Sequence, residues 1–153
     1  MRIASRAGDS GPRAGRRAAV LSATASDSHT WNLVYLQLLL EEHGFQVRNL
    51  GACVAESTLV VECAAVLPDL VVLSSVNGHG FYDGQSAIRA LRAAPALRGT
   101  AIVIGGMLGI EDADQDRASG LLAAGFDGVF PRGPGQMAMF RAFIDGVGTG
   151  VAG

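Results

Sequence analysis

The chain of 153 residues contains no lysine, and all twelve of its basic residues are arginine. Chemistry that needs a lysine amine, such as Schiff-base formation or the phosphate grip of a P-loop, is therefore excluded. The formal net charge is -2. A nucleic-acid binder needs an excess of basic residues to neutralise phosphates, so we expect no nucleic-acid partner.

Cysteine and long apolar runs are scarce as well. Cys53 and Cys63 have no second pair beside them, so they match neither a zinc site nor a redox Cys-x-x-Cys motif. The apolar run that follows Arg16 and Arg17 ends at Ser22, too early for a signal peptide. No other run approaches the length of a membrane span. We therefore expect reduced thiols, a cytoplasmic location and no contact with a membrane.

Aromatic residues make up only 6% of the chain, against 49% hydrophobic residues, so Val, Leu, Ile and Ala must build the core. Uninterrupted apolar runs at 70–73 and 101–104 are typical of parallel strands covered on both faces. Strand and helix patterns alternate: strands at 18–23, 46–50, 69–74, 100–104 and 128–130, helices at 31–43, 56–66, 83–94, 114–123 and 135–146. This alternation predicts an α/β fold, a single flavodoxin-like (Rossmann-like) doubly wound parallel sheet of five strands in the order 2-1-3-4-5.

The ends of the chain differ in composition from its middle. Residues 1–15 are rich in Gly and Arg and lack apolar periodicity, which predicts a disordered N-terminal tail. The glycines of residues 148–153 predict a flexible C-terminal tail. Residues 16–147 then form one domain of ordinary size.

Three polar or glycine-rich loops follow strands one, three and four of the predicted sheet, at residues 26–30, 74–80 and 105–106. In this strand order a ligand binds over the carboxyl ends of strands one and three. Asp27 and His29 can form a metal-ligand pair there, with the imidazole on the metal and the carboxylate on the other ring nitrogen. Taken alone, such a pair is more often a capping Asp beside a surface His.

Asp27 and His29 begin a longer pattern. Residues 33–73 separate Asn32 from Ser74-Ser75-Val76, and residues 77–104 separate Val76 from Gly105-Gly106. With this spacing the chain resembles the cobalamin-binding domain family, whose pattern is Asp-x-His-x-x-Gly, Ser-x-Leu and Gly-Gly. It is most similar to the small, cobalamin-binding subunits of adenosylcobalamin-dependent glutamate mutase (methylaspartate mutase).

The resemblance implies a role for each motif residue. His29 would be the lower axial ligand of cobalt, with Asp27 hydrogen-bonded behind it. Ser74 would bond the displaced benzimidazole, and the glycines would let the backbone approach the nucleotide tail. The simpler alternatives are that Ser74 merely ends a strand and that Gly105-Gly106 is only a turn. The implied cofactor-binding residues are Asp27, Ser28, His29, Thr30, Asn32, Ser74, Ser75, Val76, Gly78, Gly105 and Gly106, with no catalytic residue among them.

The function implied by the resemblance is that of the cobalamin-binding small subunit of a carbon-skeleton mutase, an isomerase. It would interconvert L-glutamate and 3-methylaspartate with a separate large subunit of TIM-barrel type, which would hold the small-molecule substrate. Two alternatives stay open: a corrinoid carrier for another reaction such as methyl transfer, and a flavodoxin-like module that has lost cobalamin. A phosphoacceptor receiver is unsupported, because strand three ends in Ser74 and there is no Lys.

The chain departs from the family pattern at Asn32, which stands where the motif has Gly, and more mildly at Val76, which replaces Leu. Asn32 adds a side chain near the expected nucleotide slot. Phe81 and Met107 replace residues for which the pattern leads us to expect acidic and polar side chains. Trp31, the only tryptophan, is expected to pack on the core.

Overall fold

The computed structural model describes residues 16–109 and 114–148. The tails predicted at 1–15 and 148–153 lie outside these residues, except for Gly148. The strands are β1 (Arg17–Ala23), β2 (Phe45–Asn49), β3 (Leu70–Ser75), β4 (Ala101–Gly106) and β5 (Gly128–Pro131). The helices are α1 (Trp31–Glu42), α2 (Glu56–Val66), α3 (Gly80–Ala93), α4 (Asp114–Ala124) and α5 (Gln136–Gly146), with a short 3-10 turn, η2 (Pro95–Leu97).

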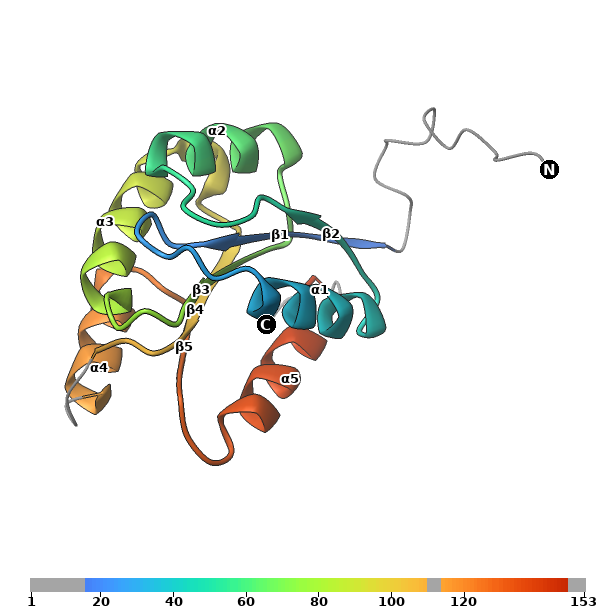
Figure 1. Cartoon of the computed structure of the whole chain (residues 1–153). Helices are drawn as coiled ribbons and strands as arrows, with labels where there is room; N and C mark the ends of the chain where they lie inside the picture. Colours follow the sequence, from blue (N-terminus) through green and yellow to red (C-terminus); the bar gives the residue numbers. More distant parts are fainter. Residues whose placement is uncertain (1–15, 110–113, 149–153) are drawn as a thin grey trace.

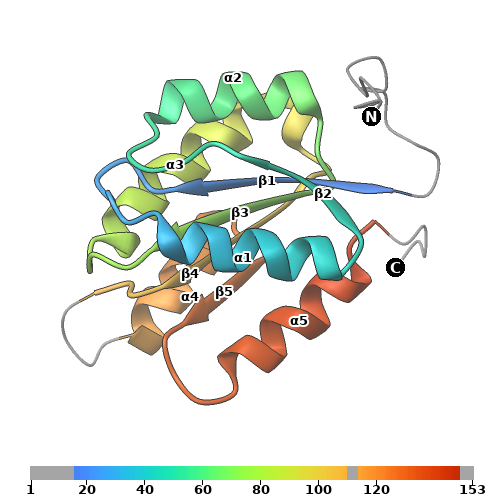
Figure 2. The same ribbon diagram turned by 45° about the vertical axis from the view of Figure 1, so that its right-hand side comes forward.

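The five strands form one parallel sheet in the order β2-β1-β3-β4-β5, as predicted from the sequence. Helices cover both of its faces (Figure 1). α1 and α5 lie on one face, and α2, α3 and α4 lie on the other (Figures 1 and 2). Parallel strands need crossover helices, and these helices bury both sides of the sheet.

The core has two layers, because successive strand residues point to opposite faces. In β3, Val71 and Leu73 pack toward α2, α3 and α4, while Leu70 and Val72 pack toward α1 and α5. All residues of β3 are buried. The uninterrupted apolar runs therefore mark two-sided strands, as expected.

Helix α3 begins at Gly80, three residues before the predicted start at Asp83. The glycines of this segment suggested a loop, but tertiary contacts make it helical. The backbone N–H of Phe81 donates to the carbonyl of Leu108 at 3.0 Å. A Cβ on Gly80 would lie 3.0 Å from the Ser75 Cβ, so the helix starts pressed against the end of β3.

Across the ranges 16–109 and 114–148, no helix has both the length and the apolar character needed to cross a bilayer. The cytoplasmic location stays a prediction.

Candidate functional site

Three loops meet at the carboxyl edge of the sheet, after β1, β3 and β4. The backbone N–H of Thr24 donates to the Ser74 carbonyl at 3.2 Å, and that of Met107 donates to the Ser75 carbonyl at 2.7 Å. These bonds hold the three strand ends side by side. The motif residues that the sequence separates by dozens of positions are thereby neighbours.

Asp27 is fully buried and ties the β1 loop to the β3 loop. Its Oδ1 accepts the backbone N–H of His29 at 2.9 Å, and its Oδ2 accepts those of Val76 and Asn77, the latter at 3.2 Å. Burial raises the pKa of this carboxyl. The hydrogen bonds from Val76 and His29 and the nearby imidazole outweigh burial, so the pKa lies below its ordinary value of 3.8. Asp27 is therefore a carboxylate at neutral pH.

The His29 ring is held at one nitrogen and open at the other. Nδ1 lies 2.7 Å from Asp27 Oδ1, and the side chain is 48% exposed. A carboxylate accepts only, so Nδ1 carries the proton, and in the neutral imidazole Nε2 is the nitrogen with the lone pair. Within the described part of the chain no three His, Cys, Asp or Glu side chains gather around a possible metal position.

Ser28 and Thr30 flank this histidine and are exposed. The Thr30 carbonyl accepts the backbone N–H groups of Leu33 and Val34, which starts α1. Thr30 therefore helps to begin α1, and Ser28 is an exposed residue of the loop between β1 and α1.

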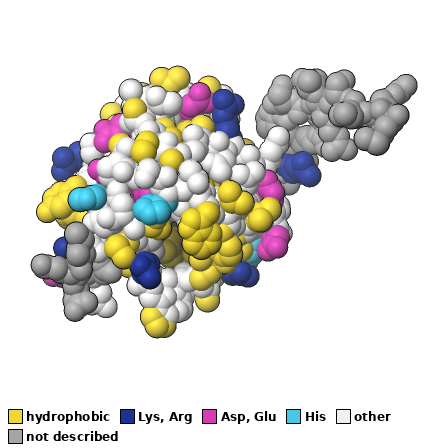
Figure 3. All heavy atoms as spheres, in the orientation of Figure 1, with side chains coloured by type: hydrophobic (Ala, Val, Ile, Leu, Met, Phe, Trp, Pro, Cys, Tyr) yellow, Lys and Arg dark blue, Asp and Glu magenta, His cyan; other side chains and the backbone are white. Residues whose placement is uncertain are grey.

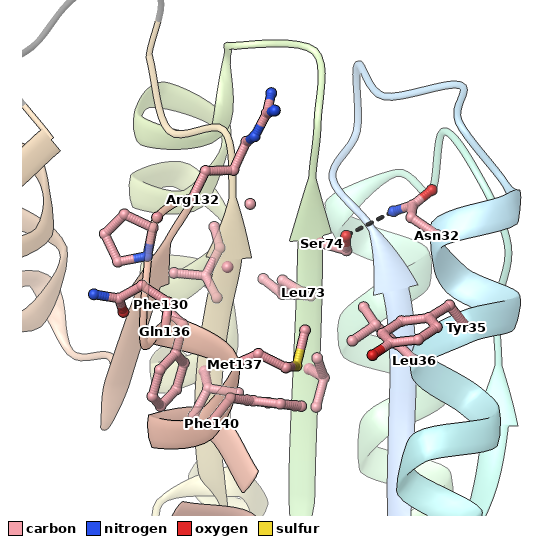
Figure 4. A pocket seen from close by; sticks show the side chains of 17 residues that line it. Asn32, Tyr35, Leu36, Leu73, Ser74, Phe130, Arg132, Gln136, Met137 and Phe140 are labelled. Carbon is pink, nitrogen blue, oxygen red and sulfur yellow. Dashed lines mark hydrogen bonds between the residues drawn. The ribbon is translucent and has the colours of Figure 1, made fainter.

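Ser74 is buried at the end of β3, and it meets Asn32 of α1. The Asn32 Nδ2 donates to Ser74 Oγ at 2.7 Å (Figure 4). The Asn32 Oδ1 is buried and has no hydrogen-bond partner. The residue that replaces the motif glycine therefore bonds directly to the motif serine.

A cavity of about 310 Å³ lies beside this pair, between the ends of β3 and β4 and the two helices α1 and α5 (Figure 4). Its walls are mainly apolar. The lining includes Leu36 of α1, Phe130 of β5, and Met137 and Phe140 of α5. Sequence reasoning missed the α5 wall, since the family motif ends at Gly106; the apolar spacing of Met137 and Phe140 on the last helix was the available signal.

Gly105 and Gly106 line the cavity, and both also lie very close to backbone atoms of the neighbouring strands. Gly106 has φ +106°, and a Cβ there would lie 1.9 Å from the Ser75 carbonyl oxygen. A Cβ on Gly105 would lie 3.0 Å from the Phe130 carbonyl oxygen. Gly106 is therefore required by the packing of β4 against β3, and Gly105 packs tightly against β5, whatever the cavity holds.

The remaining motif residues shape the β3 loop. Ser75 is buried and its Oγ donates to Asn77 Oδ1 at 3.2 Å. Val76 contributes its backbone N–H to Asp27. Gly78 turns the chain with φ +88°, a conformation that suits glycine.

Asn77 is a connecting residue that the sequence did not reveal. Its Nδ2 donates to the Ser26 carbonyl at 3.1 Å and to the Ser26 Oγ at 2.9 Å. Asp83 at the start of α3 accepts hydrogen bonds from the same serine's backbone and hydroxyl. A polar residue between the motif serines and the Gly78 turn was the only signal. Asn77 and Asp83 thus hold the β1 loop at Ser26, in addition to the bonds of Asp27.

The prediction that Trp31 packs on the core was wrong, because its side chain is 75% exposed. Helical spacing places it with Val34, Tyr35 and Leu38, which are also exposed, while Leu33 and Leu40 face the core. We name these four exposed residues the α1 outer row. In Figure 3, hydrophobic side chains gather over α1. The helix is apolar on both sides, so the sequence alone could not tell which side faces the sheet.

The sequence of this chain is similar to the sequences of several known proteins. The family model of the B12 binding domain matches residues 17–138. The glutamate mutase sigma subunit of Halobacterium salinarum is 34% identical over 131 residues, which are 85% of this chain and 84% of that protein. The sigma subunit of Carboxydothermus hydrogenoformans is 28% identical over 130 residues, 84% of this chain and 94% of that protein.

Solved structures support the fold. A cobalamin-binding protein from Desulfitobacterium hafniense superposes with a TM-score of 0.62 at 24% identity, over 75% of this chain and 53% of that one. The monomethylamine corrinoid protein of Methanosarcina barkeri gives 0.65 at 17% identity, over 82% of this chain and 57% of that one. The chain thus spans little more than half the length of these two proteins. Taken with the family match and the related sigma subunits, these findings show that the chain belongs to the B12-binding domain family.

Proposed function

We propose that this chain is the cobalamin-binding subunit of an adenosylcobalamin-dependent carbon-skeleton mutase of the glutamate mutase type. With a separate large subunit of barrel type it would interconvert L-glutamate and 3-methylaspartate. One observation carries the proposal: the buried Asp27 carboxylate holds His29 at Nδ1 and leaves Nε2 without a described partner, at the sheet edge where Asn32 and Ser74 line an apolar cavity. The relatives named as sigma subunits of glutamate mutase support the choice of reaction.

The residues present fit cobalamin. A neutral imidazole with a free Nε2 is a good ligand for cobalt, and a carboxylate on its other nitrogen fixes the tautomer and the direction of the ring. The apolar cavity suits an aromatic base of the nucleotide tail, and Ser74 at its wall has a hydroxyl proton that no described hydrogen bond uses. In this proposal the apolar cavity is the slot for the nucleotide tail, and it is lined by Ser74, Gly105 and Gly106. The loops around its entrance contain Ser28, Thr30, Ser75, Val76 and Gly78.

When bound, adenosylcobalamin supplies the radical chemistry of such rearrangements. This chain's residues bind and orient. Asp27 keeps the proton on Nδ1 and fixes the ring direction, and the bonds from Val76 and Asn77 fix Asp27 in turn. No residue of the site is assigned a proton transfer to substrate.

The α1 outer row supports docking of a large catalytic subunit. Exposed apolar rows that contain Trp and Tyr are typical of protein interfaces. The row begins at Trp31, two residues after His29, so a subunit seated on it would lie next to the cofactor edge. The partner would then exclude water from that edge.

The proposal is tested by titrating the full chain with hydroxocobalamin and following visible absorbance. We expect wild type to displace the benzimidazole from cobalt. We expect His29→Ala to bind at least about 100-fold more weakly and to lose the spectral change, because ligands and their close partners govern metal affinity. His79→Ala is the matched control, since His79 is an exposed ring at the same edge that no described side chain holds. Equal binding by wild type and His29→Ala would contradict the assignment.

A second experiment separates the mutase from another corrinoid carrier. The loaded chain is mixed with the large subunit of a glutamate mutase and with L-glutamate. Formation of 3-methylaspartate that depends on both chains and on His29 supports the proposed reaction. Binding of cobalamin without this product would leave a corrinoid carrier for a different reaction.

A further inference from the structure

The amide side chain of Asn77, in the loop between β3 and α3, has no part in the proposed function. It is only partly buried, yet each end of the amide makes two hydrogen bonds. Nδ2 donates to the carbonyl and the Oγ of Ser26, at 3.1 and 2.9 Å. Oδ1 accepts the backbone N–H of His79 at 3.0 Å and the Ser75 hydroxyl at 3.2 Å. The two backbone partners fix which end is oxygen, because an N–H only donates and a carbonyl only accepts.

The bond to the Ser26 carbonyl holds the peptide unit that leads into Asp27. A peptide unit is planar, so the Ser26 carbonyl and the Asp27 N–H turn together. The carbonyl accepts from Asn77 Nδ2 at 3.1 Å, and the N–H donates to the Thr24 carbonyl at 3.0 Å. The unit is thus held at both edges, which restricts its rotation and sets the direction in which the Asp27 side chain leaves the backbone.

Asn77 also holds the far end of the Asp27 side chain. Its backbone N–H donates to Asp27 Oδ2 at 3.2 Å. Asp27 Oδ1 lies 2.7 Å from His29 Nδ1, so the direction of the imidazole depends on the position of this carboxylate. One residue therefore fixes both the backbone and the carboxylate of Asp27, and no described hydrogen bond joins it to His29 itself.

We propose that Asn77 is a positioning residue for the cobalt ligand, which acts through Ser26 and Asp27 to direct His29 Nε2 at the metal. The inference rests on the proposed function and deepens it with a residue that the family pattern does not contain. Groups behind a metal ligand set its orientation and the affinity for the metal. The donors of the Asn77 amide carry the role, because they alone reach the Ser26 carbonyl from this side chain.

A role in its own loop alone would make Asn77 equivalent to Asn49. The bond from the His79 N–H to Asn77 Oδ1 closes a local turn, of the kind in which Asn bonds the backbone two residues on. Asn49, at the end of β2, makes the same turn with the N–H of Gly51 at 2.9 Å, and its Nδ2 donates to Gln37 at 3.2 Å. No described hydrogen bond joins the Asn49 side chain to the β1 loop. Asn49 is therefore the matched control.

The experiment compares the full wild-type chain with Asn77→Asp, Asn77→Ala and Asn49→Ala. Asn77→Asp keeps the acceptors for His79 and Ser75 and removes the donors to Ser26, whereas Asn77→Ala removes both. Thermal unfolding shows that each variant folds. Affinity is measured by absorbance titration with hydroxocobalamin.

Ligation by histidine is measured separately, in the EPR spectrum of bound cob(II)alamin. An axial nitrogen splits the cobalt lines of this spectrum. Labelling the protein with ¹⁵N-histidine changes the multiplicity of that splitting only where the axial nitrogen belongs to histidine. The spectrum therefore reports the position of the ring rather than the stability of the fold.

We expect both Asn77 variants to bind hydroxocobalamin about tenfold more weakly than wild type, as for the loss of a group behind a metal ligand. In both variants part of the bound cob(II)alamin should lose the histidine splitting. Asn49→Ala should match wild type in affinity and in splitting, even where its unfolding temperature falls as far as that of the Asn77 variants.

Three results would overturn the inference. If the Asn77 variants lose no more affinity or splitting than Asn49→Ala, Asn77 only shapes its own loop and the proposed function stands. If Asn77→Asp matches wild type while Asn77→Ala does not, the turn matters and positioning through Ser26 is wrong. If wild type itself shows no histidine splitting, even with a large subunit present, the proposed function is wrong and the positioning role is wrong with it.

Discussion

The two ends of the sheet use charged side chains in opposite ways. At the amino end, the guanidinium of Arg17 donates to the carbonyls of Ile144 at 2.6 Å and Val147 at 2.9 Å and to that of His43, and it lies 4.0 Å from the centre of the Phe45 ring. These bonds join the ends of α1 and α5 and close that side of the molecule. The charged side chain of Arg17 therefore stabilises the fold.

At the carboxyl end, Asp27 also binds backbone groups, but it leaves reactive atoms at the surface of the site. His29 Nε2 and the Ser74 hydroxyl proton have no partner among the described hydrogen bonds. The groups that we propose for ligand binding thus lie at the carboxyl edge, as the topology of parallel sheets favours. It also means that the two ends should respond differently to substitution.

The largest effect is expected for Asp27→Asn. Asn has one acceptor oxygen where Asp27 has two, so its N–H₂ faces the donors either of His29 or of Val76 and Asn77. That set of donors loses its acceptor, which should lower the free energy of unfolding by about 2–4 kcal/mol. Cobalamin affinity should fall roughly 10- to 100-fold, because His29 loses its orienting partner. Urea unfolding and absorbance titration measure the two effects.

The same variant tests the pH dependence. The folded-state pKa of Asp27 lies below 3.8, so the unfolded chain binds the extra proton first as the pH falls. The stability from this carboxylate is present above pH 3.8 and is lost as the pH drops through the folded-state value. Asp27→Asn should lack this loss. The exposed Asp145→Asn, at the other end of the sheet, is the control and should keep it; identical acid profiles for the two variants would argue against a structural carboxylate at Asp27.

An intermediate effect is expected for Arg17→Leu. Removing the guanidinium leaves the carbonyls of Ile144 and Val147 without their donor, which should lower the free energy of unfolding by about 2 kcal/mol. Cobalamin affinity should stay within about twofold of wild type, since the sites are at opposite ends of the sheet and distant sites act independently. A large loss of cobalamin affinity in a folded Arg17→Leu protein would show that the two ends of the sheet do not act independently.

The smallest effect on stability is expected for Trp31→Ser combined with Leu38→Ser. Both side chains are exposed, so the free energy of unfolding should change by less than about 0.5 kcal/mol. Association with a large subunit, followed by size-exclusion chromatography or light scattering, should weaken at least about tenfold. Val61→Ser on α2 is a control, because it removes an exposed apolar side chain on the other face of the sheet. Unchanged association would show that the subunit docks elsewhere.

The sequence predicted the strand order and the Asp27–His29 pair well for the same reason. Apolar runs such as 70–73 that alternate with helical patterns favour a covered parallel sheet, and that topology brings the loops after β1, β3 and β4 together. The exposure of Trp31 was predicted wrongly because α1 has apolar residues on both its inner and its outer side. The start of α3 at Gly80 was missed because contacts with Ser75 and Leu108, rather than local preference, make that segment helical.

By itself, then, the sequence determined the fold class and the edge at which the motif residues gather, because burial period and loop position are local properties of the chain. Only the tertiary structure decided which side of α1 faces outward, that Gly106 is required by the Ser75 carbonyl, and that Asn32 bonds to Ser74 with one oxygen unpaired. Each of these depends on distances between residues far apart in the chain. Such distances are set by packing and carry no sequence pattern of their own.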